Sequence, residues 1–472
     1  MNVSASFIFI LIISQFLNSQ SVTITFPDPS SGDGYTVSDN TITITGAGPF
    51  ELTGSEEDKS IIVSSSCTIN LNDFSLTNNE ELTPLIINEN TAVELVLRGE
   101  STLQDSVTNE NDGTIYLKNG ASLTISGEGI LNIIPNKYMA INGTDDTSLT
   151  VNGGEIQINS EANTVGGIYL KKEINFNEAT FFYSCENGAH HAIDSEGPIK
   201  LLKGEYSIYS GNGKGIQSEK NLQIGLENGE INDISLKIIT ANEGIEAMGI
   251  TINSGSVEIN SGGDGINAAS SGNECDESIQ CSGDCVCYIN INEGLLNIIS
   301  GKDGLDSNGD ITIKGGKIII FAASKGEDQP IDQDGLLSIE GGAIIAAGSS
   351  SMSGVKAQTT QIEKKYTGKI NKEIHLVVKE NDVEIFDEIT PKEANYIYFN
   401  FESAFTAELG GNKIKLLNLD EEDGNNNNFG NFIYLSNLIV LFCLILIWLK
   451  FFENIIKFMS NYLLLLLFIL LF

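Results

Sequence analysis

Six oxygen-bearing side chains recur as pairs in the middle of the chain, and the two members of each pair are three positions apart. The pairs are Glu243 with Glu246, Asp264 with Asn267, and Asp303 with Asp306. Carboxylate and amide oxygens are the ligands that calcium prefers, at about 2.3–2.6 Å. The pairs therefore predict a calcium site, provided that the fold brings them together. The ordinary alternative is that these residues serve surface turns and stay solvated.

An apolar repeat contains these pairs. Starting from Leu305, apolar residues follow six, eight, thirteen and fifteen positions later. The same pattern, with changed loop lengths in some units, starts from eight further residues: Ile115, Ile141, Ile168, Ile193, Ile216, Ile245, Ile266 and Ile331. Residues two apart on a strand face the same side, so each unit consists of short strands with one buried face.

Glycine pairs separate two strands in several units, as a tight corner with positive φ requires. Most units are 21 to 29 residues long. Short strands in units of this length predict a parallel β-helix, in which successive turns stack about 4.8 Å apart. The alternative is an antiparallel sandwich of short strands, which does not require a recurring register of apolar positions.

Stacked turns would align like positions into two polar columns. One follows the first apolar residue of each unit: Asp194, Gln217, Glu246, Asn267, Asp306 and Asp332. The other lies two places before that residue: His191, Lys214, Glu243, Asp264, Asp303 and Gln329. Carboxylates stacked at the strand spacing repel one another unless a cation lies between them. We therefore predict Glu243, Glu246, Asp264, Asn267, Asp303 and Asp306 as metal ligands. The last four of these are also predicted to contact the ligand.

The regions outside the repeat predict an exported, membrane-anchored protein. The expected order is a signal peptide (1–20), capping strands (21–84), the β-helix (85–350), a small C-terminal β module (366–419), a polar linker (420–431), a transmembrane helix (432–449) and a hydrophobic cytoplasmic tail (450–472). This order predicts a single-pass type I protein at the cell surface. The alternative is that the apolar end is removed and replaced by a lipid anchor.

Charge and cysteine content agree with an extracellular location. The net charge of −37 argues against nucleic acid as a partner, because phosphates require Lys and Arg. Six cysteines outside the predicted span are candidates for disulfides: Cys67, Cys185, Cys275, Cys281, Cys285 and Cys287. The last four are close enough in sequence that zinc is an alternative. Asn142, in Asn-Gly-Thr, is a predicted glycosylation site.

Several segments resemble a known family. The segment FELTGSEEDKSIIVSSSCTINLNDFSLTN and the units GGDGINA and GKDGLDSNGDITIKGGKIII are similar to carbohydrate-binding-domain proteins of the parallel β-helix, pectate-lyase-like type, over residues 35–350. The resemblance implies a right-handed parallel β-helix, calcium, and binding of plant polysaccharides that include acidic ones. It assigns acidic rung positions to Glu243, Asp264, Asp303 and Asp306.

The chain departs from that family in a few places. A cysteine-rich insertion interrupts the repeat, Ala192 and Pro330 replace glycines, and His191 and Lys214 replace acids. The last two replacements put calcium in doubt on their own turns.

These features favour a non-catalytic protein that binds cell-wall polysaccharides of plants or microbes, including uronate-rich ones, with the help of calcium. One alternative is a calcium-dependent polysaccharide lyase, in which Lys302 or Lys214 would remove the proton next to the uronate carboxylate. Another is a structural surface protein without a sugar ligand.

Overall fold

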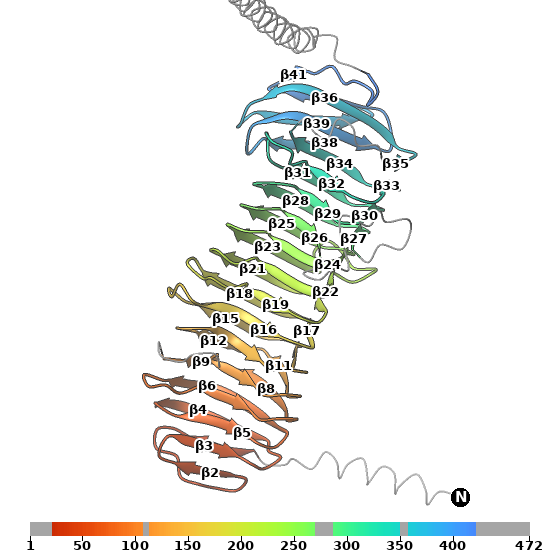
Figure 1. The fold of residues 1–472 in the computed structure, drawn as a ribbon. Coiled ribbons are helices and arrows are strands. Elements are labelled where there is room, and N and C mark those ends of the chain that lie inside the picture. Colours follow the sequence, from red (N-terminus) through yellow and green to blue (C-terminus); the bar gives the residue numbers. More distant parts are fainter. Residues whose placement is uncertain (1–20, 107–112, 270–286, 350–356, 422–472) are drawn as a thin grey trace, which may run out of the picture. The chain divides into compact units, whose positions relative to one another are not determined.

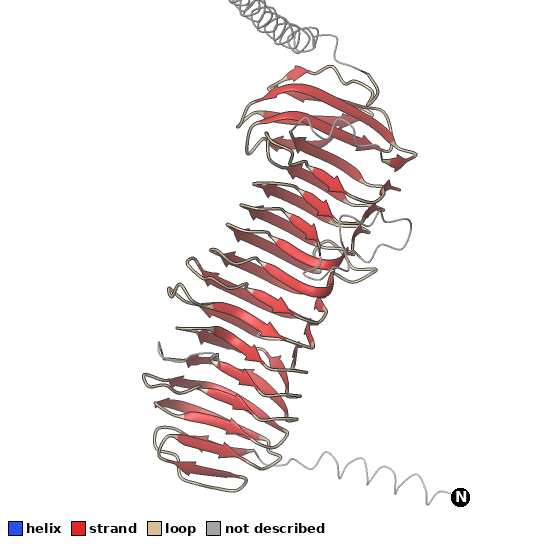
Figure 2. Ribbon diagram, viewed as in Figure 1, coloured by secondary structure: helices blue, strands red, loops and turns tan. Residues whose placement is uncertain are grey.

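The computed structural model describes residues 21–106, 113–269, 287–349 and 357–421 (Figure 1). Within these residues no segment is helical, and strands alternate with short turns (Figure 2). Most strands form one sheet of 37 strands, in which neighbours are parallel except near its two ends. The chain is thus an all-β parallel β-solenoid of about 12 turns, as the apolar repeat predicts.

Three strand stacks form the walls of the solenoid. The first stack carries the polar columns and consists of β3 (Thr41–Ile44), β5 (Ser60–Val63), β7 (Leu85–Ile87), β10 (Ile115–Leu117), β13 (Met139–Gly143), β16 (Gly166–Leu170), β19 (Ile193–Ser195), the first parts of β22 (Ile216–Ile224) and β24 (Ile245–Ile252), β26 (Ile266–Ala268), β29 (Leu305–Ser307) and β32 (Ile331–Gln333). The hairpin strand β2 (Tyr35–Ser38) pairs antiparallel with β3.

The second stack follows the first along each turn. It consists of β1 (Val22–Thr25), β4 (Phe50–Glu57), β6 (Cys67–Thr77), β8 (Ala92–Arg98), β11 (Ser122–Gly127), β14 (Ser148–Val151), β17 (Glu173–Phe176), β20 (Ile199–Leu201), the later parts of β22 and β24, β27 (Tyr288–Ile291), β30 (Asp310–Ile313), β33 (Leu337–Ile339) and β35 (Gln358–Thr359).

The third stack completes each turn. It begins with the ends of β4 and β6 and continues through β9 (Glu100–Gln104), β12 (Ile130–Ile134), β15 (Glu155–Asn159), β18 (Ala179–Cys185), β21 (Gly204–Ser210), β23 (Ile234–Thr240), β25 (Ser256–Ser261), β28 (Leu295–Ser300), β31 (Lys317–Phe321) and β34 (Ala343–Gly348).

The core is a set of apolar ladders. Ile216, Ile245, Ile266 and Leu305 are paired one to the next in the parallel register and are fully buried. Side chains alternate between the two faces of a strand, so one ladder of this kind on each wall fills the interior. The polar residue after each of these core residues consequently points outward, on the outer surface of the same wall.

A C-terminal module covers the last turns. Strand β39 (Ala394–Phe401) pairs antiparallel with β34 and with β36 (Ile362–Ile370). A second sheet contains β38 (Val383–Ile389), β37 (His375–Glu380), β40 (Phe405–Leu409) and β41 (Asn412–Lys413). Its side chains and those of β39 bury Ile319, Phe321 and Ile345, which lie on the third stack.

The predicted transmembrane arrangement is contradicted. Across the described ranges no helix is long and apolar enough to cross a bilayer, and this finding conflicts with the predicted single-pass type I membrane protein. The segments 1–20, 432–449 and 450–472, on which the signal peptide, the span and the tail are predicted, lie outside the described residues.

Removal of one rung of a core ladder tests the stacking. Ile245→Ala should lower the free energy of unfolding by about 2–5 kcal/mol, because it leaves a cavity between Ile216 and Ile266. The exposed Ser207→Ala, on β21, should change it by less than about 0.5 kcal/mol. Denaturant unfolding measures both values, and equal effects of the two variants would contradict the stacked core.

Candidate cation-binding site

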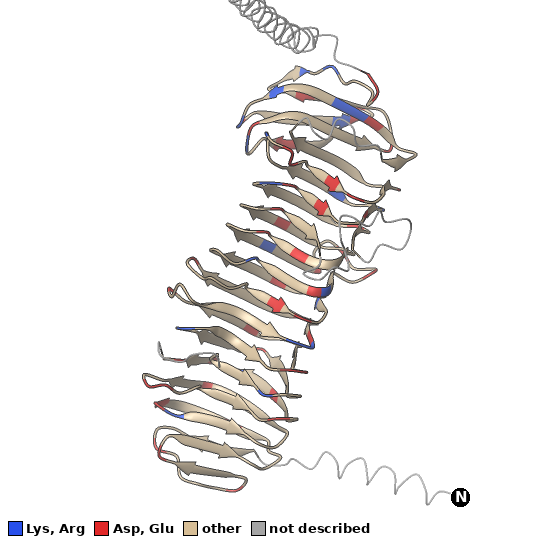
Figure 3. Cartoon of the chain, viewed as in Figure 1, with Lys and Arg blue, Asp and Glu red and all other residues tan. Residues whose placement is uncertain are grey.

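The first stack aligns one predicted column in register. Asp194, Gln217, Glu246, Asn267, Asp306 and Asp332 are paired in this order on successive turns. We call these residues the strand column. Acidic residues recur on successive strands of the solenoid (Figure 3). The predicted alignment of Glu246, Asn267 and Asp306 is therefore confirmed.

A leading column lies three residues earlier on each turn: His191, Lys214, Glu243, Asp264, Asp303 and Gln329. Three of its side chains accept backbone N–H groups from the next turn. Asp264 Oδ1 accepts from Asp303 N at 2.9 Å, and Asp303 Oδ1 accepts from Gln329 N. His191 Nδ1 accepts from Lys214 N at 2.9 Å. Burial lowers the pKa of His191 to about 4, so its ring is neutral at pH 7 and can act as this acceptor.

The two columns converge on a triad of carboxylates. Asp264, Asp303 and Asp306 each present an oxygen, and these oxygens all lie within 4.8 Å of one another. Asp264 is only 5% exposed, and the other two are half-buried. Oxygens this close can contact one cation together, because each needs to be about 2.3–2.6 Å from calcium.

The protein compensates the charge of the triad only in part, through Lys302, which lowers the pKa of Asp264 without forming a salt bridge with it. No ion pair of the described residues includes any of the three carboxylates. Burial, and then neighbouring carboxylates, raise the pKa of Asp306 to about 7. Burial raises the pKa of Asp303 to about 7 as well, and it also raises that of Asp264. Three carboxylates in this environment favour either protonation or a bound cation.

Glu243 and Glu246 do not join the triad. Lys214 Nζ lies 2.6 Å from Glu246 Oε1 and 3.9 Å from Glu243 Oε2. The predicted set of six ligands is therefore divided. Glu243 and Glu246 are paired with a lysine, whereas the carboxylates of the triad have no such partner among the described residues.

Asn267 supplies a further oxygen near the triad. It is paired in register with Asp306, and its Oδ1 atom is buried without a hydrogen-bond partner. Gln217 Oε1, two turns earlier in the same column, is also buried without a partner. A buried acceptor with no donor is costly, and a cation would satisfy it.

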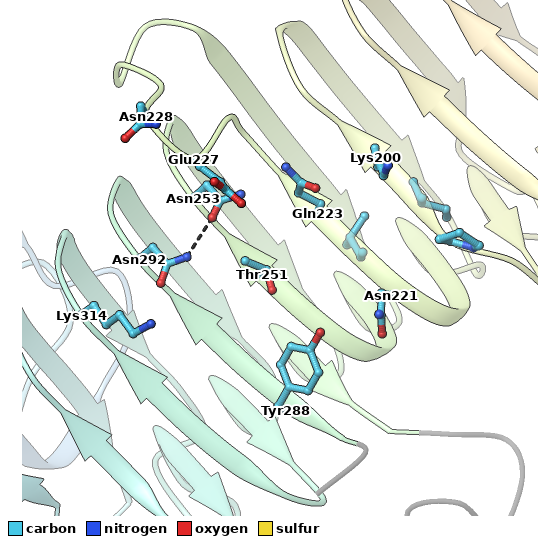
Figure 4. Close-up of a pocket in the computed structure, with 13 residues that line it drawn as sticks. Lys200, Asn221, Gln223, Glu227, Asn228, Thr251, Asn253, Tyr288, Asn292 and Lys314 are labelled. Atoms are coloured by element: carbon cyan, nitrogen blue, oxygen red, sulfur yellow. Dashed lines mark hydrogen bonds between the residues drawn. The ribbon is translucent and has the colours of Figure 1, made fainter. Parts of the chain in front are cut away.

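A polar groove, which the sequence analysis did not identify, lies on the second stack. Its volume is about 680 Å³, and Lys200, Gln223, Thr251 and Tyr288 lie along it (Figure 4). At the edge of the groove, Asn292 Nδ2 donates to Asn253 Oδ1 on the adjacent turn at 2.8 Å. The only sequence signal for this groove is a series of polar residues at the outward positions of these strands.

The cysteines divide into two groups. Cys67 and Cys185 are buried free thiols, so the prediction that they form disulfides is wrong. They lie on β6 and β18, where each fills an inward position of its wall. Cys287 is disulfide-bonded. Cys275, Cys281 and Cys285 lie outside the described residues.

The remaining predicted residues lie on the solenoid wall. Asn142, the predicted glycosylation site, is 7% exposed and lies within β13 rather than in a surface loop. Lys302 is exposed, next to Asp303. Lys214 is only 16% exposed and is held in its ion pairs.

Fold and site together define a parallel β-solenoid with a largely buried carboxylate triad on one wall, which forms no salt bridge within the described residues. The family model of carbohydrate-binding domain-containing proteins matches residues 38–280 and 229–385, and the chain belongs to this family. Membership supports a carbohydrate-related function and, with it, a polysaccharide as the partner.

A solved structure is also similar to part of the chain. It is titled as the polysaccharide lyase-like protein from C. thermocellum, in a gadolinium derivative, and the sequences are 16% identical. The match covers 68% of this chain and 93% of that chain, with a TM-score of 0.26. No curated protein matches the chain.

The raised pKa values predict how stability depends on pH when no divalent cation is present. An unfolded Asp has a pKa of about 3.9, whereas Asp303 and Asp306 titrate at about 7 in the fold. Between these values the folded state binds more protons than the unfolded state. The free energy of unfolding should therefore decrease as pH rises from about 4 through 7.

Denaturant unfolding in chelator from pH 5 to pH 8 measures this slope. The double variant Asp303→Asn/Asp306→Asn should reduce it, because the amides do not titrate, and the half-buried carboxyl of Asp194, whose pKa is also raised to about 7, should account for part of the remaining slope. Identical slopes for the wild type and the double variant would show that the triad does not carry the raised pKa values.

Proposed function

We propose that the protein is a non-catalytic, calcium-dependent polysaccharide-binding protein whose ligands include uronate-rich chains. The observation that carries this proposal is the triad of Asp264, Asp303 and Asp306, which forms no salt bridge with any of the described residues. Family membership supplies the carbohydrate class, and the triad supplies the reason for calcium.

Calcium fits the triad on the chemistry of its donors. Three carboxylates and the unpartnered amide oxygen of Asn267 form a set of oxygen ligands, which suits a hard cation better than a thiol- or imidazole-binding metal. Asp264 and Asp303 are held in place by the backbone N–H groups that they accept. The ligand oxygens are thus oriented before a cation binds.

Acidic sugars would need such a cation. The net charge of −37 repels the carboxylates of a uronate chain. Calcium on the triad supplies positive charge between the protein carboxylates and those of the sugar. A polysaccharide lying along the first stack would meet this charge on the outer surface of the wall.

The arrangement of the lysines gives no support to a lyase. A general base must reach the proton that it removes. Lys214 is held by Glu246 at 2.6 Å, on the turns before the triad. Lys302 is an exposed neighbour of Asp303 that lowers the pKa of Asp264, but no salt bridge among the described residues fixes its side chain. Binding without cleavage is therefore the function that the site supports best.

Calcium should stabilise the wild type and should be required for its binding to immobilised polygalacturonate. At a calcium concentration of one hundred times Kd, the free energy of unfolding should rise by about 2.7 kcal/mol. Asp303→Asn/Asp306→Asn should abolish both effects. Glu258→Gln, which removes an exposed charge on the third stack, should retain them.

Two results would contradict this proposal. Binding that is unchanged in chelator would exclude the role of calcium. Accumulation of unsaturated product, measured by its ultraviolet absorbance, would show cleavage rather than binding.

A further inference from the structure

The triad occupies three positions that recur elsewhere in the solenoid. Asp264 is the leading-column residue of one turn, and Asp303 and Asp306 are the leading-column and strand-column residues of the next turn. Two turns earlier, the same three positions hold Lys214, Glu243 and Glu246. The two sets differ in charge, because Lys214 occupies the position that Asp264 has in the triad.

The ammonium group of Lys214 lies where carboxylates of the following turn converge. Its Nζ atom is 2.6 Å from Glu246 Oε1 and 3.9 Å from Glu243 Oε2. The three side chains are only 15–19% exposed. Other inter-turn lysine pairs are more open, since the side chains of Lys237 and Glu258 are 48% and 53% exposed. The ion pair of Lys214 is thus built into the wall rather than extended into solvent.

The backbone holds both sets in the same way. Gly215 N, next to Lys214, donates to Glu243 O on the following turn at 3.2 Å. Gly265 N, next to Asp264, donates to Asp303 O on the following turn at 2.9 Å. The two sets therefore share a common scaffold, on which the identity of one side chain decides whether positive charge comes from the protein or from solution.

We propose that Lys214 is a resident cation, which occupies the place that a divalent metal ion takes at the Asp264 triad and so closes a second metal site formed by Glu243 and Glu246. This inference rests on the proposed cation site at the triad. It makes Lys214 a specificity-determining residue, because it sets how many cations the column binds.

Removal of the lysine should open the second site. Lys214→Asp places an acid at the position equivalent to Asp264, and the variant should bind one more Tb³⁺ or Ca²⁺ per chain than the wild type. The matched control is Lys237→Asp, which makes the same change of charge in the exposed pair with Glu258. The control should bind the same number of ions as the wild type. Terbium luminescence and titration calorimetry give these stoichiometries.

The reciprocal change should close the triad. Asp264→Lys places an ammonium group beside Asp303 and Asp306, and this variant should bind one ion fewer than the wild type. The triple variant Lys214→Asp/Glu243→Gln/Glu246→Gln should lose the ion that Lys214→Asp gains. These results together would assign the extra ion to the positions around residue 214.

The effect of calcium on the melting temperature distinguishes a cation-replacing role of Lys214 from a merely structural one. Lys214→Gln leaves Glu243 and Glu246 without their cation, so its melting temperature should fall in chelator. Calcium should restore more of that loss than the increment that it gives the wild type. A melting temperature that falls and does not respond further to calcium would mean that Lys214 only supports the fold.

The outcomes distinguish the two proposals. A wild type that binds no ion would overturn the proposed function of the triad. A folded Lys214→Asp variant that binds the same number of ions as the wild type would overturn the role of Lys214, whatever the triad binds. Should Lys214→Asp fail to fold even with calcium present, the calcium response of Lys214→Gln decides the question.

Discussion

In-register stacking of like positions is the constraint on which the rest of the structure depends. A parallel solenoid places equivalent positions of successive turns about 4.8 Å apart. When these positions hold residues of the same type, like side chains lie next to one another. For apolar residues this repetition is favourable, as the ladder from Ile216 to Leu305 shows. For carboxylates it is unfavourable, and the protein must supply a compensating group at each turn. The polar columns show which group reduces the repulsion at each turn.

Three solutions to this electrostatic problem lie along one wall. A neutral imidazole serves at His191, an ion pair at Lys214, and half-buried carboxylates with raised pKa values at Asp303 and Asp306. All three keep the backbone hydrogen bonds between turns while they differ in charge. The backbone therefore does not determine which turn attracts a cation. That property resides in single side chains placed on a shared backbone arrangement.

The fold and the columns could be predicted because they follow from periodicity. A strand fixes the face of every second residue, so the offsets from Leu305 suffice to place the core and to align Glu246, Asn267 and Asp306. The partners of long side chains could not be predicted, since the reach of Lys214 to Glu246 depends on side-chain conformation. The even number of cysteines led to an incorrect prediction of disulfides for Cys67 and Cys185, which serve as small buried apolar residues. The groove beside Tyr288 could not be found because it depends on the shape of the wall, which the repeat does not specify.

The strands that end the main sheet have a consequence for self-association. A stack of identical turns would offer unpaired N–H and C=O groups on its terminal strands, and a second copy could continue the ladder there. Here β2 at the N-terminal end of the first stack and β39 at the C-terminal end of the third stack run against the strands with which they pair, whereas β1 and β35 end the second stack in the parallel sense. A reversed strand interrupts the translational repeat, so a second copy finds no matching parallel register at the two reversed ends. At these two places the chain limits its own growth into fibres, although its interior has the repetitive pairing on which fibrous assemblies are built.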